Sequence, residues 1–182
     1  MRELKFHEKK LLKKVDFLNW GKDSNIRETK IMRRYYIQKR DDLKKYSRIC
    51  GLIKKIVSKL MLLKPNDEYR VKKTSELLNK LYDLGLIKSK NSLKDIDDIG
   101  ISRFCRRRLS VILARNKYTE SVKQAVTYIE QGQVNVGVDV VYNPATMIPR
   151  AMEDHISWVN TSKIKKTIDM YNDNRDDYDM LN

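Results

Sequence analysis

The sequence has few of the residues on which several common protein classes depend. Its only cysteines, Cys50 and Cys105, have no CxxC or Cys/His spacing, so neither a disulfide scaffold nor a zinc site is indicated. The six glycines are scattered and form no phosphate-binding loop. No apolar run approaches the roughly 20 residues that cross a bilayer, and the N-terminus lacks a secretory signal pattern. We expect a soluble intracellular protein with no membrane partner, metal or cofactor.

Groups arranged for catalysis are also missing. His7 and His155 have no acid or cysteine at ligand spacing, and the acidic pairs at 97–98 and 153–154 accompany no recognisable nucleophile. This indicates that the protein is not an enzyme and has no small-molecule substrate.

Positive charge is abundant and unevenly distributed. Lys and Arg number 39 against 24 Asp and Glu, a net charge of +15. Residues 1–64 carry 20 basic and 7 acidic side chains, whereas residues 172–182 carry 1 and 4. Such an excess repels itself unless an anionic partner neutralises it, and nucleic acid is the leading candidate.

Apolar periodicity predicts a mostly helical N-terminal half. Residues 25–63 read as one long helix, or as a helix broken near Gly51, and residues 70–84 as an amphipathic helix that stops at Gly85. The segment 91–100 is expected to be a connector with at most one helical turn.

The stretch FCRRRLSVILARNK, residues 104–117, is predicted to form a single helix. On a helical wheel its apolar residues share one stripe, and Arg108 and Arg115 form a row outside it, about 10 Å apart. Arg103 and Arg107 form a second row. Both rows are expected to be free for phosphate contact, so replacing Arg108 and Arg115 by Ala should spare folding and flatten the salt dependence of RNA binding by about two ions.

Helix and strand signals then alternate. A helix is predicted over about 119–131, capped by Thr119 and stopped by Gly132. Valines alternate with polar residues from 134 to 140, which indicates a strand or tight hairpin, and 155–159 offers another strand. A last short helix is expected over 162–171, followed by an acidic tail.

The order of these elements resembles the S4 RNA-binding domain. The resemblance runs from about Arg106 to Trp158, and its specific part is the ordered set Arg108, Leu109, Ser121, Ala125, Ile129, Gly132, Val134, Val136 and Pro144. It implies an α+β, predominantly helical fold with two helices beside a small β-hairpin. The basic residues that many relatives carry on the second helix are replaced here by Val122 and Val126, so the first helix should make more of the phosphate contacts.

Flanking segments extend the resemblance to the ribosomal protein S4 family over nearly the whole chain. The chain divides accordingly into a basic arm (1–24), a helical extension (25–100), the S4 domain (101–160) and a C-terminal helix with its acidic tail (161–182). Within that family the chain is most similar to members of the small-subunit processome. This implies a nuclear, nucleolar factor whose partners are U3 small nucleolar RNA, pre-ribosomal RNA and other processome proteins, and which promotes pairing of the two RNAs.

The RNA-contacting residues are predicted mainly from the basic cluster. Arginine suits this role because its planar guanidinium binds phosphate through two parallel hydrogen bonds and stacks on unpaired bases. The predicted set is Arg103, Arg106, Arg107, Arg108, Arg115, Lys117, Lys123, Gln133, Asn135 and Arg150.

Three other functions compete with this interpretation. A permanent ribosomal protein would carry the same domain, a basic scaffold would bind an acidic protein, and an RNA-modifying enzyme would need an active site that the remaining residues do not show.

Overall fold

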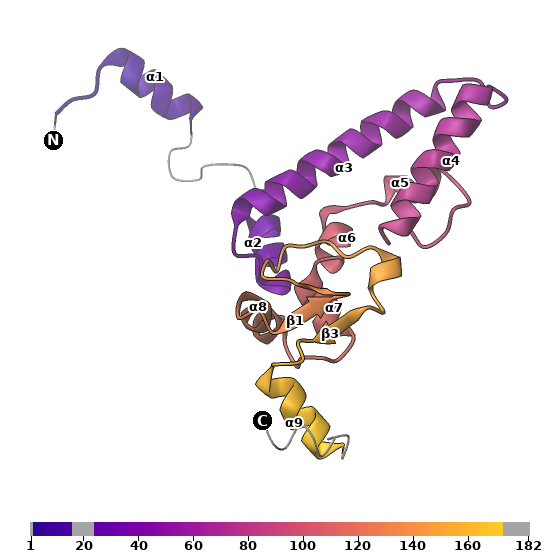
Figure 1. Cartoon of the computed structure of the whole chain (residues 1–182). Coiled ribbons are helices and arrows are strands. Elements are labelled where there is room, and N and C mark those ends of the chain that lie inside the picture. Colours follow the sequence, from indigo (N-terminus) through magenta and orange to yellow (C-terminus); the bar gives the residue numbers. More distant parts are fainter. Residues whose placement is uncertain (1, 16–23, 173–182) are drawn as a thin grey trace.

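The computed structural model describes residues 2–15 and 24–172, which form mainly helices and one small antiparallel sheet (Figure 1). This confirms the predicted α+β, predominantly helical class. The helices are α1 (Phe6–Lys14), α2 (Ser24–Tyr35), α3 (Arg40–Met61), α4 (Glu68–Asp83), α5 (Lys94–Asp97), α6 (Ile101–Arg106), α7 (Leu109–Arg115), α8 (Val122–Glu130) and α9 (Lys163–Tyr171). The strands are β1 (Val134–Val136), β2 (Asp139–Val140) and β3 (Ile156–Trp158), in the order β2-β1-β3.

The basic stretch 25–63 contains two helices, and its break lies at residues 36–39. Tyr36 has a φ of 48°, and the next amide, that of Ile37, donates back to the Met32 carbonyl at 3.0 Å. Ile37 is buried, so the helix ends where this side chain enters the core. Gly51 was predicted to mark the break and does not, because it lies inside α3.

The N-terminal core lies between α3 and the helices that follow it. Leu43, Val57, Ile87, Ile96 and Cys105 are almost completely buried there. α4 ends as predicted at Gly85, which has a φ of 74°. α3 and α4 extend away from the sheet as two long neighbouring helices (Figure 1).

The single helix predicted for residues 104–117 is wrong, because the chain forms two helices, α6 and α7, with Arg107 and Arg108 between them. The Leu109 amide donates to the Thr146 carbonyl at 2.9 Å, and the Ile148 amide donates to the Arg107 carbonyl at 3.0 Å. Residues 146–148 thus take over backbone groups that a continuous helix would have paired internally. A wheel drawn through the break therefore misplaces the arginines.

The C-terminal core joins α7 and α8 to the sheet. Leu109, Ile112, Ile129, Val134 and Ile156 are buried in it, as the two-helix prediction required. The hairpin between β1 and β2 and the strand β3 confirm the alternation read from the sequence.

The boundaries of α8 differ from the prediction at one end only. Ser121, rather than Thr119, caps α8 by accepting from the Gln124 amide, and Gln124 returns the contact as a capping box. Gly132, with a φ of 68°, follows the helix as predicted. The predicted last helix is α9, which Ser162 caps.

Candidate nucleic-acid interface

The arginines that the sequence singled out fall into two groups, and Arg107 belongs to the buried one. Its Nε and Nη2 donate to the Ile148 carbonyl at 3.0 and 2.6 Å, and its Nη1 pairs with Glu153 at 2.8 Å. Desolvation by burial, with the nearby charge of Arg150, lowers its pKa. The predicted exposed row containing Arg107 is therefore wrong in geometry, because this side chain holds the 146–153 segment against α6.

Arg108 is also buried, contrary to its predicted place beside the apolar stripe. It is 2% exposed, and its Nη1 donates to Tyr46 Oη at 3.1 Å and to Asp42 Oδ2 at 3.3 Å. Its Nε has no hydrogen-bond partner among the described residues. It lines a cavity of about 530 Å³ whose charges balance, since Arg108, Lys39 and Lys45 face three acids, Asp41, Asp42 and Glu130. Arg108 thus connects α3 to the start of α7.

Two more predicted arginines make tertiary contacts to backbone. Arg103 donates to the Leu86 carbonyl at 3.0 Å and Arg150 to the Ile87 carbonyl at 2.6 Å. The Arg150 guanidinium also lies 4.0 Å from the centre of the Tyr82 ring, a favourable cation–π distance. Both side chains are half-buried. They hold the loop after α4 and the segment after the hairpin in place.

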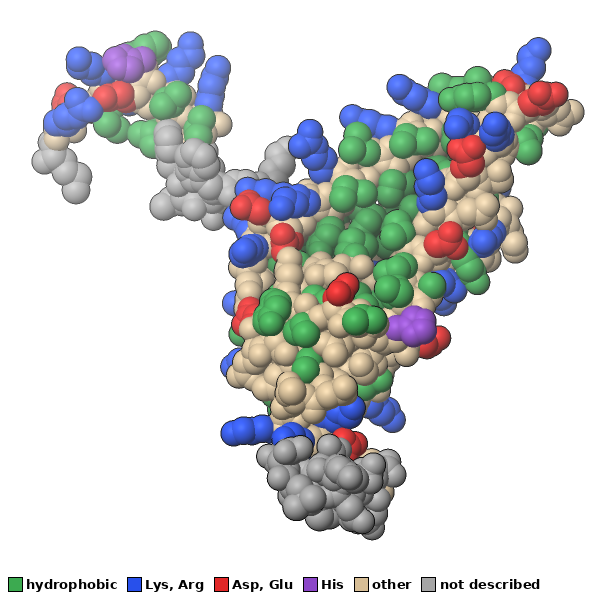
Figure 2. All heavy atoms as spheres, in the orientation of Figure 1, with side chains coloured by type: hydrophobic (Ala, Val, Ile, Leu, Met, Phe, Trp, Pro, Cys, Tyr) green, Lys and Arg blue, Asp and Glu red, His purple; other side chains and the backbone are tan. Residues whose placement is uncertain are grey.

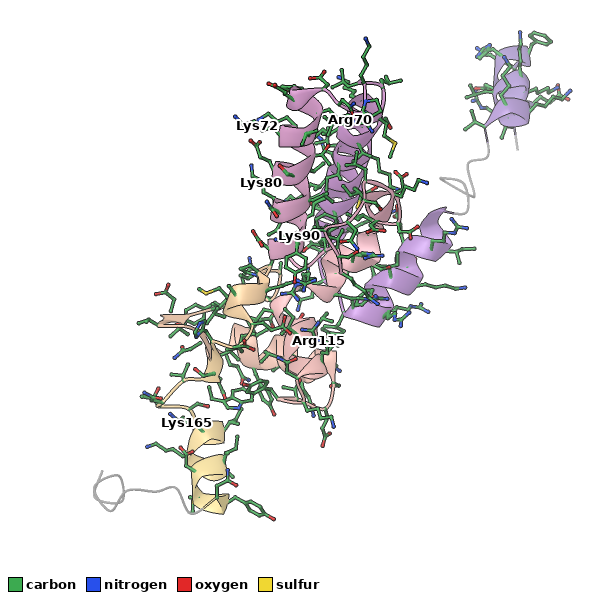
Figure 3. All side chains as sticks on the ribbon, turned by 90° about the vertical axis from the view of Figure 1, so that its right-hand side faces the viewer. Arg70, Lys72, Lys80, Lys90, Arg115 and Lys165 are labelled. Atoms are coloured by element: carbon green, nitrogen blue, oxygen red, sulfur yellow. The ribbon has the colours of Figure 1, made fainter. Side chains whose placement is uncertain are left out.

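The second group remains at the surface. Arg106 is exposed, with a 3.4 Å contact from Nε to Tyr35 Oη, and Arg115 is 49% exposed although it pairs with Glu153. Lys117 and Lys123 are exposed, and neither ammonium group has a hydrogen bond or ion pair to the described residues. These four cations occupy the ends of α6 and α7, the loop after α7, and α8. Figure 3 shows Arg115 at the level of the central body, between α4 above and α9 below.

The two polar hairpin residues of the predicted set are half-buried. Gln133 accepts from Ser162 Oγ at 3.2 Å, so it connects the hairpin to the cap of α9. Asn135 has a buried Oδ1 without a partner among the described residues. Gln133 is thus partly occupied by internal structure, whereas the Asn135 oxygen keeps an unused acceptor.

One basic surface was not in the predicted set. The long helix α3 carries exposed cations along the face opposite its buried stripe. The available signal was a run without any acidic residue, from Leu43 to Met61, that contains six Lys and Arg residues.

The part of the chain that the structure describes contains no group of three or more His, Cys, Asp and Glu side chains placed to hold a metal ion. In the same residues, no helix combines the length and apolarity needed to cross a membrane. Both thiols are buried, and burial raises the pKa of Cys50 and that of Cys105, the latter to about 11.

Similarity to known proteins extends along the entire chain. Residues 3–106 match the family described as Ribosomal protein S4/S9 N-terminal domain. The U3 small nucleolar ribonucleoprotein protein IMP3 of Saccharomyces cerevisiae is 48% identical over 98% of both chains. The chain belongs to the IMP3 family. The human IMP3 protein is 44% identical over 99% of this chain and 98% of its own.

More distant similarity reaches ribosomal proteins. The small ribosomal subunit protein uS4 of Methanocella arvoryzae is 25% identical over 81% of this chain and 74% of its own length. The IMP3 similarity is therefore both higher in identity and more complete in coverage. The family match ends at Arg106, so it covers α1 to α6 and not α7, α8 or the hairpin.

Proposed function

We propose that the chain is an RNA-binding assembly factor of the U3 small nucleolar ribonucleoprotein, acting in small-subunit ribosome assembly in the nucleolus. The observation that carries this proposal is the full-length similarity to IMP3 proteins, which are named as proteins of that particle. The excess of 15 positive charges supports an RNA partner. Other proteins of the processome would dock on the remaining surface.

The proposed activity is to promote pairing of U3 RNA with pre-ribosomal RNA. Two complementary strands repel each other through their phosphates, and a cationic protein reduces that repulsion by releasing condensed counterions. Of the predicted contact residues, the exposed set of Arg106, Lys117 and Lys123 is free to approach phosphates, whereas Arg115 is exposed but paired with Glu153. The surface that carries this exposed set is held in place by the internal contacts of Arg103, Arg107, Arg108 and Arg150. At the hairpin, Gln133 and Asn135 would add polar contacts to the RNA. No nucleotide hydrolysis is needed for this activity.

The cellular experiment is to crosslink RNA to the protein and sequence what is bound. Enrichment of U3 RNA and of the pre-ribosomal segment that pairs with it is the expected result. Recovery of unrelated messenger RNA with no U3 enrichment would overturn the proposal.

The contact residues are tested in vitro with a charge-neutralised variant, Arg106→Gln, Lys117→Gln and Lys123→Gln. Its affinity for a single-stranded U3 segment should fall, and the salt dependence should flatten by about two ions, since each phosphate contact on a single strand releases roughly 0.7. The control carries Lys72→Gln, Lys80→Gln and Lys88→Gln, which remove the same charge from exposed positions elsewhere. Equal losses in both variants would show that only net charge matters.

A permanent place in the ribosome is the second candidate, favoured by the similarity to uS4 proteins. Sedimentation of cell extracts separates the two functions. The assembly factor should travel with precursor particles and be missing from mature small subunits. Retention in mature subunits at one copy each would favour the ribosomal protein. Binding of an acidic peptide in preference to RNA at matched salt would favour a protein scaffold.

A further inference from the structure

The outer face of α3 carries a straight row of cations. Lys44, Arg48, Lys55 and Lys59 fall within a sector of about 60° on the helical wheel, and the row is roughly 22 Å long at 1.5 Å per residue. The six buried residues of α3, among them Leu43, Ile53 and Val57, lie on the opposite side. All four basic side chains are exposed. We call this set the α3 row.

Acidic side chains hardly compensate the α3 row. Between Leu43 and Met61 the sequence has no Asp or Glu. Counting only partners in residues 2–15 and 24–172, Lys44 alone of the row has an ion pair, with Asp41 at 3.8 Å. Both of those side chains are largely exposed, so the pair contributes little. The pairs Lys44/Arg48 and Lys55/Lys59 are like charges four residues apart, an arrangement that destabilises a helix. A face needed only for solubility would alternate the two signs.

A glycine lies in the widest gap of the row. Gly51 is exposed, sits between Arg48 and Lys55 on the same face, and has no atom within 4 Å of the position that a Cβ would occupy. Internal packing therefore does not require glycine there, although glycine in a helix interior is destabilising relative to alanine. A missing side chain lets an external backbone approach the helix closely.

The α3 row points away from the helices on which α3 packs. α3 packs against α2, α5 and α6, and the row lies opposite the stripe that makes those contacts. Figure 2 shows Lys and Arg side chains along the outer edge of α3, on the side away from α4. Arg106, Lys117 and Lys123 belong to other elements, α6, the α7–α8 loop and α8. The chain thus presents two basic surfaces on different elements.

We propose that the α3 row is a second RNA-binding site, which contacts the phosphates of a different strand from the one held by Arg106, Lys117 and Lys123. This rests on the proposed function and gives it a mechanism, since a protein that holds two strands raises the local concentration of each for the other. RNA is the occupant that this charge favours. A line of cations with a glycine at its centre matches a sugar–phosphate backbone, while the exposed side chains of Ile49, Leu52 and Ile56 lie to one side of the row.

The test counts how many strands each protein molecule binds. Native mass spectrometry is performed with a 12-nucleotide single-stranded RNA of a sequence that cannot pair with itself. The row variant carries Lys44→Gln, Arg48→Gln, Lys55→Gln and Lys59→Gln. The matched control carries Lys72→Gln, Lys80→Gln, Lys88→Gln and Lys94→Gln; Figure 3 shows that Lys72 and Lys80 point outward from α4, away from α3. Circular dichroism checks that both variants keep their helices.

The expected stoichiometry is two strands for the natural protein and for the control, and one for the row variant. Annealing of two complementary RNAs should slow about tenfold or more in the row variant. Two strands on the row variant, or one on the control, would overturn the proposal. Loss of acidic-peptide binding in the row variant, with RNA stoichiometry unchanged, would assign the surface to a protein instead.

Failure of the proposed function gives a different result. If the Arg106, Lys117 and Lys123 surface bound no RNA, the natural protein would bind one strand, the variant at those three positions would still bind one, and the row variant would bind none.

Gly51 provides a test at constant charge. Gly51→Met adds a side chain where the strand should pass closest, while the open space at this position leaves the core untouched. The second strand should bind several-fold more weakly, and the helix should melt at a higher temperature. Unchanged binding of the second strand would show that nothing approaches α3 closely at this point.

Discussion

At the scale of single residues, the environment of each arginine determines what it does. Arg107 and Arg108 are 5% and 2% exposed and have carbonyl or carboxylate partners. The preceding residue, Arg106, is exposed. A buried guanidinium needs a compensating anion, and Glu153 and Asp42 supply it for Arg107 and Arg108. Of these three consecutive arginines, Arg107 and Arg108 therefore stabilise the fold, and Arg106 contributes surface charge.

Arg108→Ala should destabilise the protein strongly. Removing the guanidinium leaves the half-buried Asp42 carboxylate without its cation and Tyr46 Oη without its donor. The expected loss in the free energy of unfolding is about 3 kcal/mol or more, measured by urea denaturation. Lys117→Ala, an exposed control, should change it by less than about 0.5 kcal/mol. An unchanged urea midpoint for Arg108→Ala would restore the view that this residue is a free phosphate contact.

Cys105 should make stability fall at alkaline pH. Burial raises the pKa of its thiol in the folded protein to about 11, from an ordinary value of 9.0. The folded state thus favours the neutral thiol, so its contribution is complete below about pH 9 and is lost as pH rises toward 11. Urea midpoints from pH 8 to 11 should decline more steeply for the natural protein than for Cys105→Ala. Parallel declines would contradict this assignment, because Tyr46, whose pKa burial also raises, is present in both.

At the scale of elements, backbone contacts from distant segments decide where helices break. α6 and α7 are separated because residues 146–148 bond to the backbone at Arg107 and Leu109, and α2 ends where Ile37 enters the core. Local propensity favours helix through both points, so apolar periodicity located the helical regions and misplaced the two breaks. By contrast, α8 and the hairpin follow their local signals, since a capping box and Gly132 bound the helix.

Ile129→Ala should test the packing of α8 on the sheet. Ile129 is 0% exposed and lies in the cluster with Leu109, Ile112 and Val134. The expected cost is about 2–5 kcal/mol in unfolding free energy, through lost apolar burial and the cavity left behind. Thr127→Ala, on the exposed side of α8, is the control. Urea denaturation followed by circular dichroism gives both values, and equal midpoints would contradict the observed packing.

At the scale of the whole molecule, two cores are joined by polar contacts. One cluster lies among α3 to α6, and the other joins α7 and α8 to the sheet. Arg108 and Arg150 cross between the N-terminal helices and the rest through Asp42 and Ile87. The division of the chain at residues 100 and 160 stays a prediction. α1 stands apart from both cores, and none of its described residues is buried (Figure 1).

Removing residues 1–15 should spare folding and weaken assembly. The only helix lost is α1, which buries no side chain, so the free energy of unfolding should change by less than about 0.5 kcal/mol. The exposed lysines of α1, including Lys9, Lys10 and Lys13, should make RNA or protein contacts in the particle. Urea denaturation and sedimentation with precursor particles measure the two effects. A large drop in the urea midpoint, with normal sedimentation, would place α1 in the folded core.

The sequence by itself determined the fold class, the helical regions, the hairpin and the family resemblance. Each of these depends on local patterns: apolar periodicity, caps, glycine stops and an ordered set of residues. The tertiary structure alone decided which arginines are internal, because a side chain's exposure depends on segments far away in the chain, here Asp42 and Ile148 around Arg107 and Arg108. It also decided that the cations of α3 form one outward row. The sequence showed their number and the lack of acids, but only packing against α5 and α6 fixes the direction in which that face points.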